Sequence, residues 1–199
     1  PIELKNNENS FFIGKIDING KELLAKAFHQ AILKSQHTNN LNQNNEKRSA
    51  YNKFEKQLQG IISEIIVVEY LKLIFNKEDN LVIRYDDVRL DGFKSPQNEY
   101  DIKLKFEKNE YDIEVRSSLS YKKEMDYNNL KNFDVLGPYS NKMKKNEAYS
   151  DYYIRPILQL KNPSSNLDIK NISISENLIN DNFDFYITGG CNKLMMMNS

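Results

Sequence analysis

The residues best suited to chemistry lie between Tyr100 and Ser118, where charged and apolar side chains alternate. This period of two predicts a β-hairpin whose connection is centred near Lys108-Asn109. Successive side chains of a strand point to opposite faces, so one surface of the hairpin should carry the charges. The charged positions on that surface are Asp101, Lys103, Lys105, Asp112, Glu114 and Arg116.

A turn at this position would place Asp101 across from about Arg116, and Glu114 across from about Lys103. Two carboxylates would then share a surface with two cations. Such a surface suits a functional site, but an ordinary exposed hairpin face carries similar charges. The hairpin pattern alone therefore leaves both interpretations open.

A long helical pattern upstream contributes another acid. From about Ser49, apolar residues recur at helical spacing for roughly six turns, namely Tyr51, Phe54, Leu58, Ile61, Ile62, Ile65, Val68 and Leu71. Glu64 lies one residue from the centre of that stripe. An ionised carboxylate at the margin of an apolar face is costly unless it is paired. The sequence leaves three possibilities: a metal ion, an arginine partner, or a position at the rim in contact with water.

Together these segments resemble the PD-(D/E)XK nuclease superfamily, in which a helix contributes Glu, a strand contributes Asp, and the next strand contributes acid-x-Lys. The matching residues are Glu64, Asp101 and Glu114-Val115-Arg116, within a resemblance that covers roughly residues 51–121. It implies an α/β domain with a mixed central β-sheet flanked by helices, a restriction-endonuclease-like fold. Arg116 departs from the pattern because the family usually has Lys there.

The resemblance further implies a Mg²⁺-dependent deoxyribonuclease, with Mn²⁺ as a substitute cofactor. Asp101, Glu114, the carbonyl of Val115 and Glu64 would be the metal ligands, since Mg²⁺ prefers hard oxygen donors. Arg116 cannot serve as a base because its pKa stays above ~12, although it can grip a phosphate oxygen. Lys103 is the expected substitute for the missing ammonium.

Further residues are expected to contact DNA. Ser117, Ser118 and Tyr121 follow the acid-x-Arg motif and would contact phosphate. A basic stretch with interleaved tyrosines follows them, a composition that suits phosphate and base contacts but that a lysine-rich chain also produces by itself. The expected lysine contacts are Lys122, Lys142, Lys144 and Lys145.

The resulting hypothesis is a DNA endonuclease of restriction or genome-defence type, which would need a homodimer or a larger nuclease assembly to cut both strands. One alternative keeps the fold and makes the protein a recombination, repair or effector nuclease. A second alternative is a non-catalytic nucleic-acid-binding domain. A third is a structural or interaction domain whose hairpin acids are merely solvated.

Composition limits these hypotheses. The 28 basic and 28 acidic side chains cancel, so a local patch would have to provide any attraction to DNA. Cys191 is the only cysteine, which excludes an internal disulfide and a cysteine-based zinc site. No run of 18 apolar residues occurs and the first residues do not resemble a signal peptide, so we expect a cytoplasmic protein without membrane contact.

The length of 199 residues suits a single nuclease-like domain over 1–199, with an N-terminal helical part at about 1–50 and a core at about 51–190. Helical spacing predicts a helix from about Lys21 to Ser35. Strands are expected at 81–85, at 152–160 with Pro156 marking an edge or a bulge, and at 183–188 before Gly189-Gly190. The acids Asp86, Asp87 and Asp91 are interpreted as turn residues.

Overall fold

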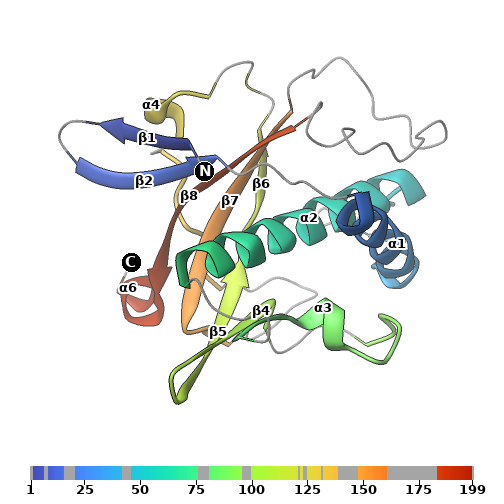
Figure 1. The fold of residues 1–199 in the computed structure, drawn as a ribbon. Helices are drawn as coiled ribbons and strands as arrows, with labels where there is room; N and C mark the ends of the chain where they lie inside the picture. The colour runs from blue at the N-terminus through green and yellow to red at the C-terminus, as the bar shows by residue number, and fades with distance from the viewer. Residues whose placement is uncertain are drawn as a thin grey trace.

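The computed structural model describes residues 2–6, 9–15, 21–41, 46–75, 81–95, 100–120, 122, 125–130, 132–138, 148–160 and 183–198. Within them, one mixed sheet has the strand order β1-β2-β8-β7-β5-β4-β3, and β6 pairs with β7 off this path (Figure 1). The strands are β1 (Ile2–Asn6), β2 (Asn9–Lys15), β3 (Val82–Arg84), β4 (Ile102–Phe106), β5 (Asn109–Val115), β6 (Ser118–Ser120), β7 (Tyr152–Leu160) and β8 (Phe183–Asn192).

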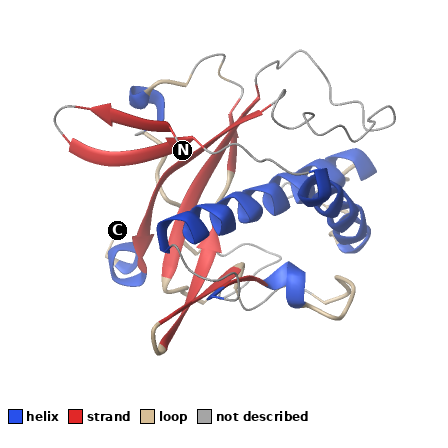
Figure 2. Ribbon diagram, in the orientation of Figure 1, coloured by secondary structure: helices blue, strands red, loops and turns tan. Residues whose placement is uncertain are grey.

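Helices cover the sheet, which confirms the expected α/β class with a mixed central sheet flanked by helices (Figure 2). The described helices are α1 (Lys21–His37), α2 (Ala50–Phe75), α3 (Tyr85–Val88), α4 (Tyr127–Leu130) and α6 (Lys193–Met197). The predicted helices at 21–35 and from 49 onward correspond to α1 and α2. None of the described helices is both long and apolar enough to cross a membrane.

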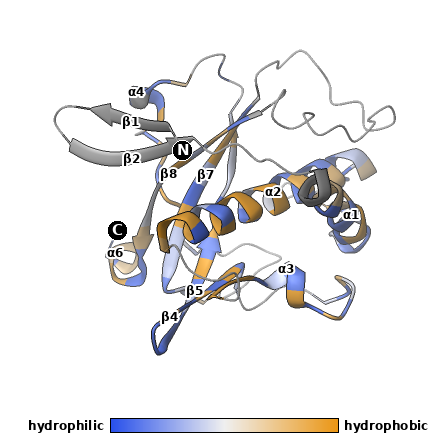
Figure 3. Ribbon diagram, viewed as in Figure 1, coloured by the Kyte–Doolittle hydropathy of each residue, from blue (hydrophilic) through white to orange (hydrophobic). Residues whose placement is uncertain are grey.

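Helix α2 forms the centre of the core, and its middle and second half are coloured mainly as apolar in Figure 3. All eight residues from Ile61 to Val68 are buried, so this stretch is enclosed on every side and not by one stripe alone. It packs against α1 and against the apolar face of the sheet, where Ile102, Ile113 and Leu158 contribute. On the opposite face, Leu130 of α4 packs with residues of β7 and β8.

The hairpin exists, but its predicted register was wrong by two residues. Phe106 pairs with Asn109, so the connection is Glu107-Lys108 and Asn109 belongs to β5. Glu107 takes a left-handed conformation at φ 55°, which is uncommon for a side chain other than Gly or Asn. This tight turn gave no sequence signal, and it places Lys103 opposite Asp112.

Strands β7 and β8 also differ from expectation. Pro156 is not at an edge, because β7 lies between β8 on one side and β5 with β6 on the other. The expected bulge is present as a register shift between Ile154 and Pro156 in the pairing with β8. Strand β8 continues through Gly189-Gly190 to Asn192 and does not end before them; an added Cβ at Gly190 would lie 2.5 Å from the carbonyl oxygen of Tyr153.

We expect Ile66→Ala to lower the free energy of unfolding by about 2–5 kcal/mol, because it leaves a cavity where the side chain is fully buried. Leu73→Ala, on the same helix but 59% exposed, is the matched control and should change little. Urea denaturation followed by circular dichroism measures both. Equal effects would contradict the placement of α2 in the core.

Candidate functional site

Asp101 is the residue through which the candidate site is assembled. It lies directly before β4, and its carbonyl oxygen accepts a hydrogen bond from the amide of Tyr85 at 2.9 Å. Its carboxylate oxygen Oδ2 accepts another from the amide of Val115 at 2.8 Å. The main chain and the side chain of Asp101 are thus fixed between the start of α3 and the end of β5.

Glu114 lies beside Asp101, since the pairing of Ile102 with Ile113 places residues 101 and 114 opposite each other at the next position. Burial and then the charge of Glu114 raise the pKa of Asp101, while the Val115 amide, Lys34 and Arg116 act in the other direction. The result is a pKa of about 7. Two carboxylates of the predicted site therefore repel each other at close range.

Arg116 is close to both acids. Its Nη2 lies 3.3 Å from Oε1 of Glu114, and both side chains are mostly buried. Strand alternation accounts for this pair because residues two apart in an extended segment point to the same face. The structure brings Asp101, Glu114 and Arg116 together, with Asp101 opposite Glu114 and not opposite Arg116.

Glu64 is buried at 6% exposure, and its Oε2 accepts a hydrogen bond from Nη1 of Arg84 at 3.2 Å. An arginine partner is thus the alternative that the structure shows, and a rim position in water is excluded. Burial raises the pKa of Glu64 to about 8, with Asp101 and Asp86 raising it and Lys34 and Arg84 lowering it. Asp101 consequently interacts with an acid on α2 as well as with Glu114 on β5.

Lys34 of α1 is the functional candidate that the sequence analysis missed. Its Nζ lies 2.8 Å from Oδ2 of Asp86, and its side chain keeps 20% exposure. Burial lowers the pKa of Lys34, but Glu64, Asp86 and Asp101 outweigh this and raise it. A signal was available, because Lys34 follows Ala27 and Ala31 at helical spacing and so falls on the buried stripe of α1.

The acids of the link after β3 are not all turn residues. That interpretation holds for Asp91, whose carboxylate accepts hydrogen bonds from the amides of Phe93 and Ser95. Asp86 is fully buried between Lys34 and Arg89. The carboxylate of Asp87 accepts a hydrogen bond from Nη2 of Arg84 at 2.6 Å. The same nitrogen also donates to the side-chain oxygen of Gln30. A buried ionic network therefore joins α1, α2, β3 and α3.

Lys103 points to a different set of partners. Its Nζ lies 3.5 Å from Glu110 and 3.5 Å from Asp112, and 4.6 Å from the ring centroid of Tyr100. The expectation that Glu114 lies across from Lys103 was wrong, because the corrected register places Asp112 there. Of the two lysines, Lys34 is the one that interacts with both Asp101 and Glu64.

The expected DNA contacts are only partly within the described residues. Ser117 and Ser118 lie where β5 gives way to β6, and Oγ of Ser118 accepts a hydrogen bond from Arg155 at 2.6 Å. Lys122 is exposed and its ammonium donates to Asn129. The remaining four, Tyr121, Lys142, Lys144 and Lys145, lie outside the described residues.

A divalent cation suits part of the expected ligand set. Asp101 and Glu114 supply two hard oxygen donors whose mutual repulsion a cation would relieve, and Mg²⁺ commonly uses only one or two carboxylates. Glu64 fits less well because Arg84 already holds its carboxylate. Over the described part of the chain, no three His, Cys, Asp or Glu side chains form a group that could hold a metal ion.

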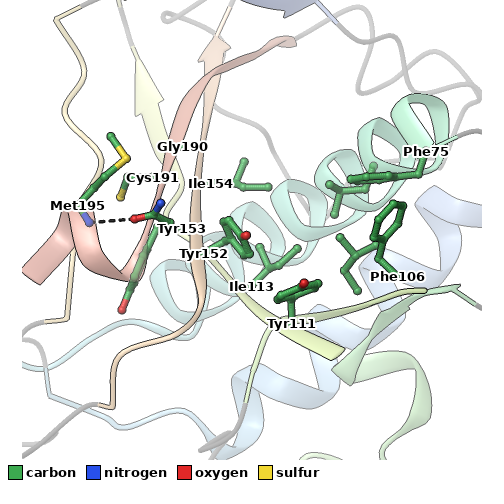
Figure 4. A pocket seen from close by; sticks show the side chains of 13 residues that line it. Phe75, Phe106, Tyr111, Ile113, Tyr152, Tyr153, Ile154, Gly190, Cys191 and Met195 are labelled. Carbon is green, nitrogen blue, oxygen red and sulfur yellow. Dashed lines mark hydrogen bonds between the residues drawn. The ribbon is translucent and has the colours of Figure 1, made fainter. Parts of the chain in front are cut away.

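A separate pocket of about 550 Å³ lies where the end of α2 meets the hairpin, β7 and β8. Figure 4 shows its aromatic lining, with Phe75 beside Phe106 and Tyr111 near Tyr152. Cys191 also lines it, and burial raises the pKa of this thiol. The lining includes Ile113 but none of the acids of the candidate site.

The raised pKa of Asp101 predicts a pH dependence of stability. The folded protein holds this proton more tightly than the unfolded chain, so the associated stability is present below about pH 4 and lost as the pH rises toward 7. In EDTA, Asp101→Asn should lose less unfolding free energy than wild type between pH 5 and 8. Denaturant titration at each pH measures this, with the surface variant Glu69→Gln as control. Parallel curves for all three proteins would contradict the raised pKa.

Arg84→Met should destabilise the fold by about 3–5 kcal/mol, because it leaves Glu64 buried without its arginine partner. The double variant Glu64→Leu/Arg84→Met should cost less than the sum of its two single variants. A double-mutant cycle of unfolding free energies tests this coupling. Strict additivity would show that the pair does not act as a unit.

Comparison with known proteins identifies one distant relative and no family. The chain is 26% identical over 205 residues to Uncharacterized protein MJECS01 of Methanocaldococcus jannaschii, and the alignment covers 94% of this chain and 73% of that protein. No protein-family model and no solved structure matches the chain. Since that relative is itself uncharacterized, it assigns no activity here.

Proposed function

We propose that the protein is a metal-dependent DNA endonuclease with a restriction-endonuclease-like fold. The observation that carries this proposal is the position of Asp101, whose carboxylate is held by the Val115 amide beside Glu114. Asp101 and the Glu114-Val115-Arg116 segment therefore lie next to each other, as the resemblance to the nuclease motif requires. Glu64 on α2, which interacts with Asp101, supplies the helical acid of the same pattern.

In this proposal Mg²⁺, or Mn²⁺ in its place, would be held by Asp101 and Glu114, with the carbonyl of Val115 as a further oxygen donor. A bound divalent ion would activate water, offset charge on the phosphate and stabilise the leaving oxygen. Glu64 would act less as a ligand than as a positioning residue, because its ion pair with Arg84 ties α2 to β3 beside Asp101.

The cations of the site would act on the phosphate. Arg116 presents planar guanidinium donors next to Glu114, and such donors bind phosphate oxygens well. Lys34 would supply the ammonium that the strand motif lacks, since it is partly exposed and interacts with Asp101. Both would compensate the negative charge that increases in the transition state.

The biological setting belongs to the same proposal. A restriction or genome-defence role follows from the family resemblance, and cleavage of both DNA strands would require a homodimer or a larger assembly. The residues that follow Arg116 in the chain would make further contacts to DNA phosphates, namely Ser117, Ser118 and Lys122.

One observation favours a second candidate function, a non-catalytic DNA-binding domain. Arg84 and Arg116 already pair with Glu64 and Glu114, so both carboxyl groups have partners within the protein. A domain of this kind would bind DNA through the same surface and cut nothing. Recombination, repair and effector nucleases share the proposed chemistry and differ in their DNA substrate.

Cleavage of plasmid DNA with Mg²⁺ or Mn²⁺ tests the proposal. We expect activity that EDTA abolishes, and a loss of at least ~100-fold, or ~2.7 kcal/mol of barrier, in Asp101→Asn and Glu114→Gln. Both variants should keep the wild-type circular dichroism spectrum. DNA binding without cleavage by the wild type would instead support the non-catalytic domain, and neither binding nor cleavage would exclude both functions.

Parallel variants decide which lysine supplies the ammonium. Lys34→Met should slow cleavage by at least ~10-fold, whereas Lys103→Met should change the rate by less than ~3-fold. Lys72→Met is the matched control, since Lys72 also lies on a helix and pairs with an acid, Glu69, at 3.3 Å. A large loss in Lys103→Met with normal turnover in Lys34→Met would reverse this assignment.

A further inference from the structure

Strands β5 and β6 follow one continuous register along β7. Val115 pairs with Ile154 and Ser118 pairs with Ile157, both in parallel orientation and with the same offset. No residue is inserted or skipped between the two strands. They are therefore two parts of a single strand that loses its regular pairing at Arg116 and Ser117.

The sequence of β7 explains the interruption. In a parallel ladder, a residue donates its N–H to one residue of the neighbouring strand and accepts from the residue two positions further along. The amide of Arg116 donates to the carbonyl of Ile154 at 2.9 Å. Its own carbonyl should accept from residue 156, which is a proline and has no N–H to donate.

The side chain of Arg155 takes over this role. Its Nη1 donates to the carbonyl oxygen of Arg116 at 3.0 Å, and its Nη2 donates to Oγ of Ser118 at 2.6 Å. Arg155 is 5% exposed as a residue, and burial lowers the pKa of its guanidinium. Removing a charged group from water is costly, so a buried arginine in this place indicates a specific use.

We propose that Arg155 is a positioning residue that replaces the missing amide of Pro156 and fixes the strand segment carrying Arg116 and Ser118. Its guanidinium bridges the interruption, because Nη1 donates to the main-chain carbonyl of Arg116 and Nη2 donates to the side chain of Ser118. The effect on DNA cleavage rests on the proposed nuclease function. The substitution for the main-chain donor does not.

Pro156 removes a main-chain donor from the ladder, and Arg155 supplies a side-chain donor in its place. A residue with an N–H at 156 would hold the carbonyl of Arg116 by a backbone hydrogen bond instead. With the proline, a single buried side chain controls the carbonyl of Arg116 and the orientation of the Ser118 hydroxyl together. Arg116 and Ser118 follow Glu114 closely in the chain. A shift of this strand segment would therefore move the proposed phosphate contacts relative to the acids.

Two readouts test this proposal in the full chain. Amide hydrogen exchange at Ser118 and Ser120 reports the pairing of β6, and single-turnover cleavage of plasmid with Mn²⁺ reports the site. The variants are Arg155→Met, Arg155→Lys and Arg155→Met/Pro156→Ala. Tyr186→Phe is the control, because it removes another buried hydrogen bond, to Gln159 at 3.1 Å. Gln159 pairs with Ser120, so the two variants are compared at the amide of Ser118.

In Arg155→Met we expect exchange at the Ser118 amide to accelerate at least ~10-fold relative to Tyr186→Phe, and exchange at the Ser120 amide to accelerate relative to wild type. Cleavage should slow at least ~10-fold while the Kd for DNA changes less than ~3-fold. Adding Pro156→Ala should restore much of the exchange protection and much of the cleavage rate. The new amide of residue 156 should itself be protected from exchange. Arg155→Lys, which keeps the charge but cannot reach both acceptors, should lose protection at β6 even if Arg155→Met fails to fold.

Unchanged exchange in both single variants, or no recovery and no protected amide in the double variant, would overturn the proposal. Altered exchange with normal cleavage would overturn the positioning of the site. A wild-type protein that cuts no DNA would refute the proposed function instead, and the exchange data would still decide whether Arg155 replaces the amide.

Discussion

The confinement of several carboxylates from distant parts of the chain to one buried place is the constraint on which this structure depends. Asp101 interacts with Glu64 on one side and with Glu114 on the other. Burial makes each negative charge costly, and proximity adds repulsion. Cations next to these acids, among them Lys34 and Arg84, offset part of this cost. The acids can therefore stay buried and need not move into bulk water.

This arrangement explains why elements far apart in sequence are needed. Helix α1 provides Lys34, β3 provides Arg84, and the hairpin provides Asp101 and Glu114. The apolar core on α2 fixes the distances between them, because residues 61–68 are buried on every side. A site built on packed helices and paired strands can keep mutually repelling groups together, which a mobile loop could not do.

Local patterns predicted the two long helices and the central strands, but the part at about 1–50, expected to be helical, also contains β1 and β2. The long-range partners were not predicted. Alternation identified the hairpin, yet the turn at Glu107-Lys108 escaped notice because neither residue is a usual left-handed turn residue, and the pairing opposite Lys103 was therefore wrong. Helical spacing marked Glu64 as unusual but could not name Arg84, which lies 20 residues away. Lys34 was missed because a lysine on a helix is ordinarily assigned to solvent.

The central claim is that Asp101 and Glu114 hold a divalent cation against a DNA phosphate. Anomalous diffraction from crystals grown with Mn²⁺ and a short DNA duplex would measure this most directly. We expect a manganese peak in contact with both carboxylates and with a phosphate oxygen. Manganese found only elsewhere, with the DNA bound away from these two residues, would contradict it.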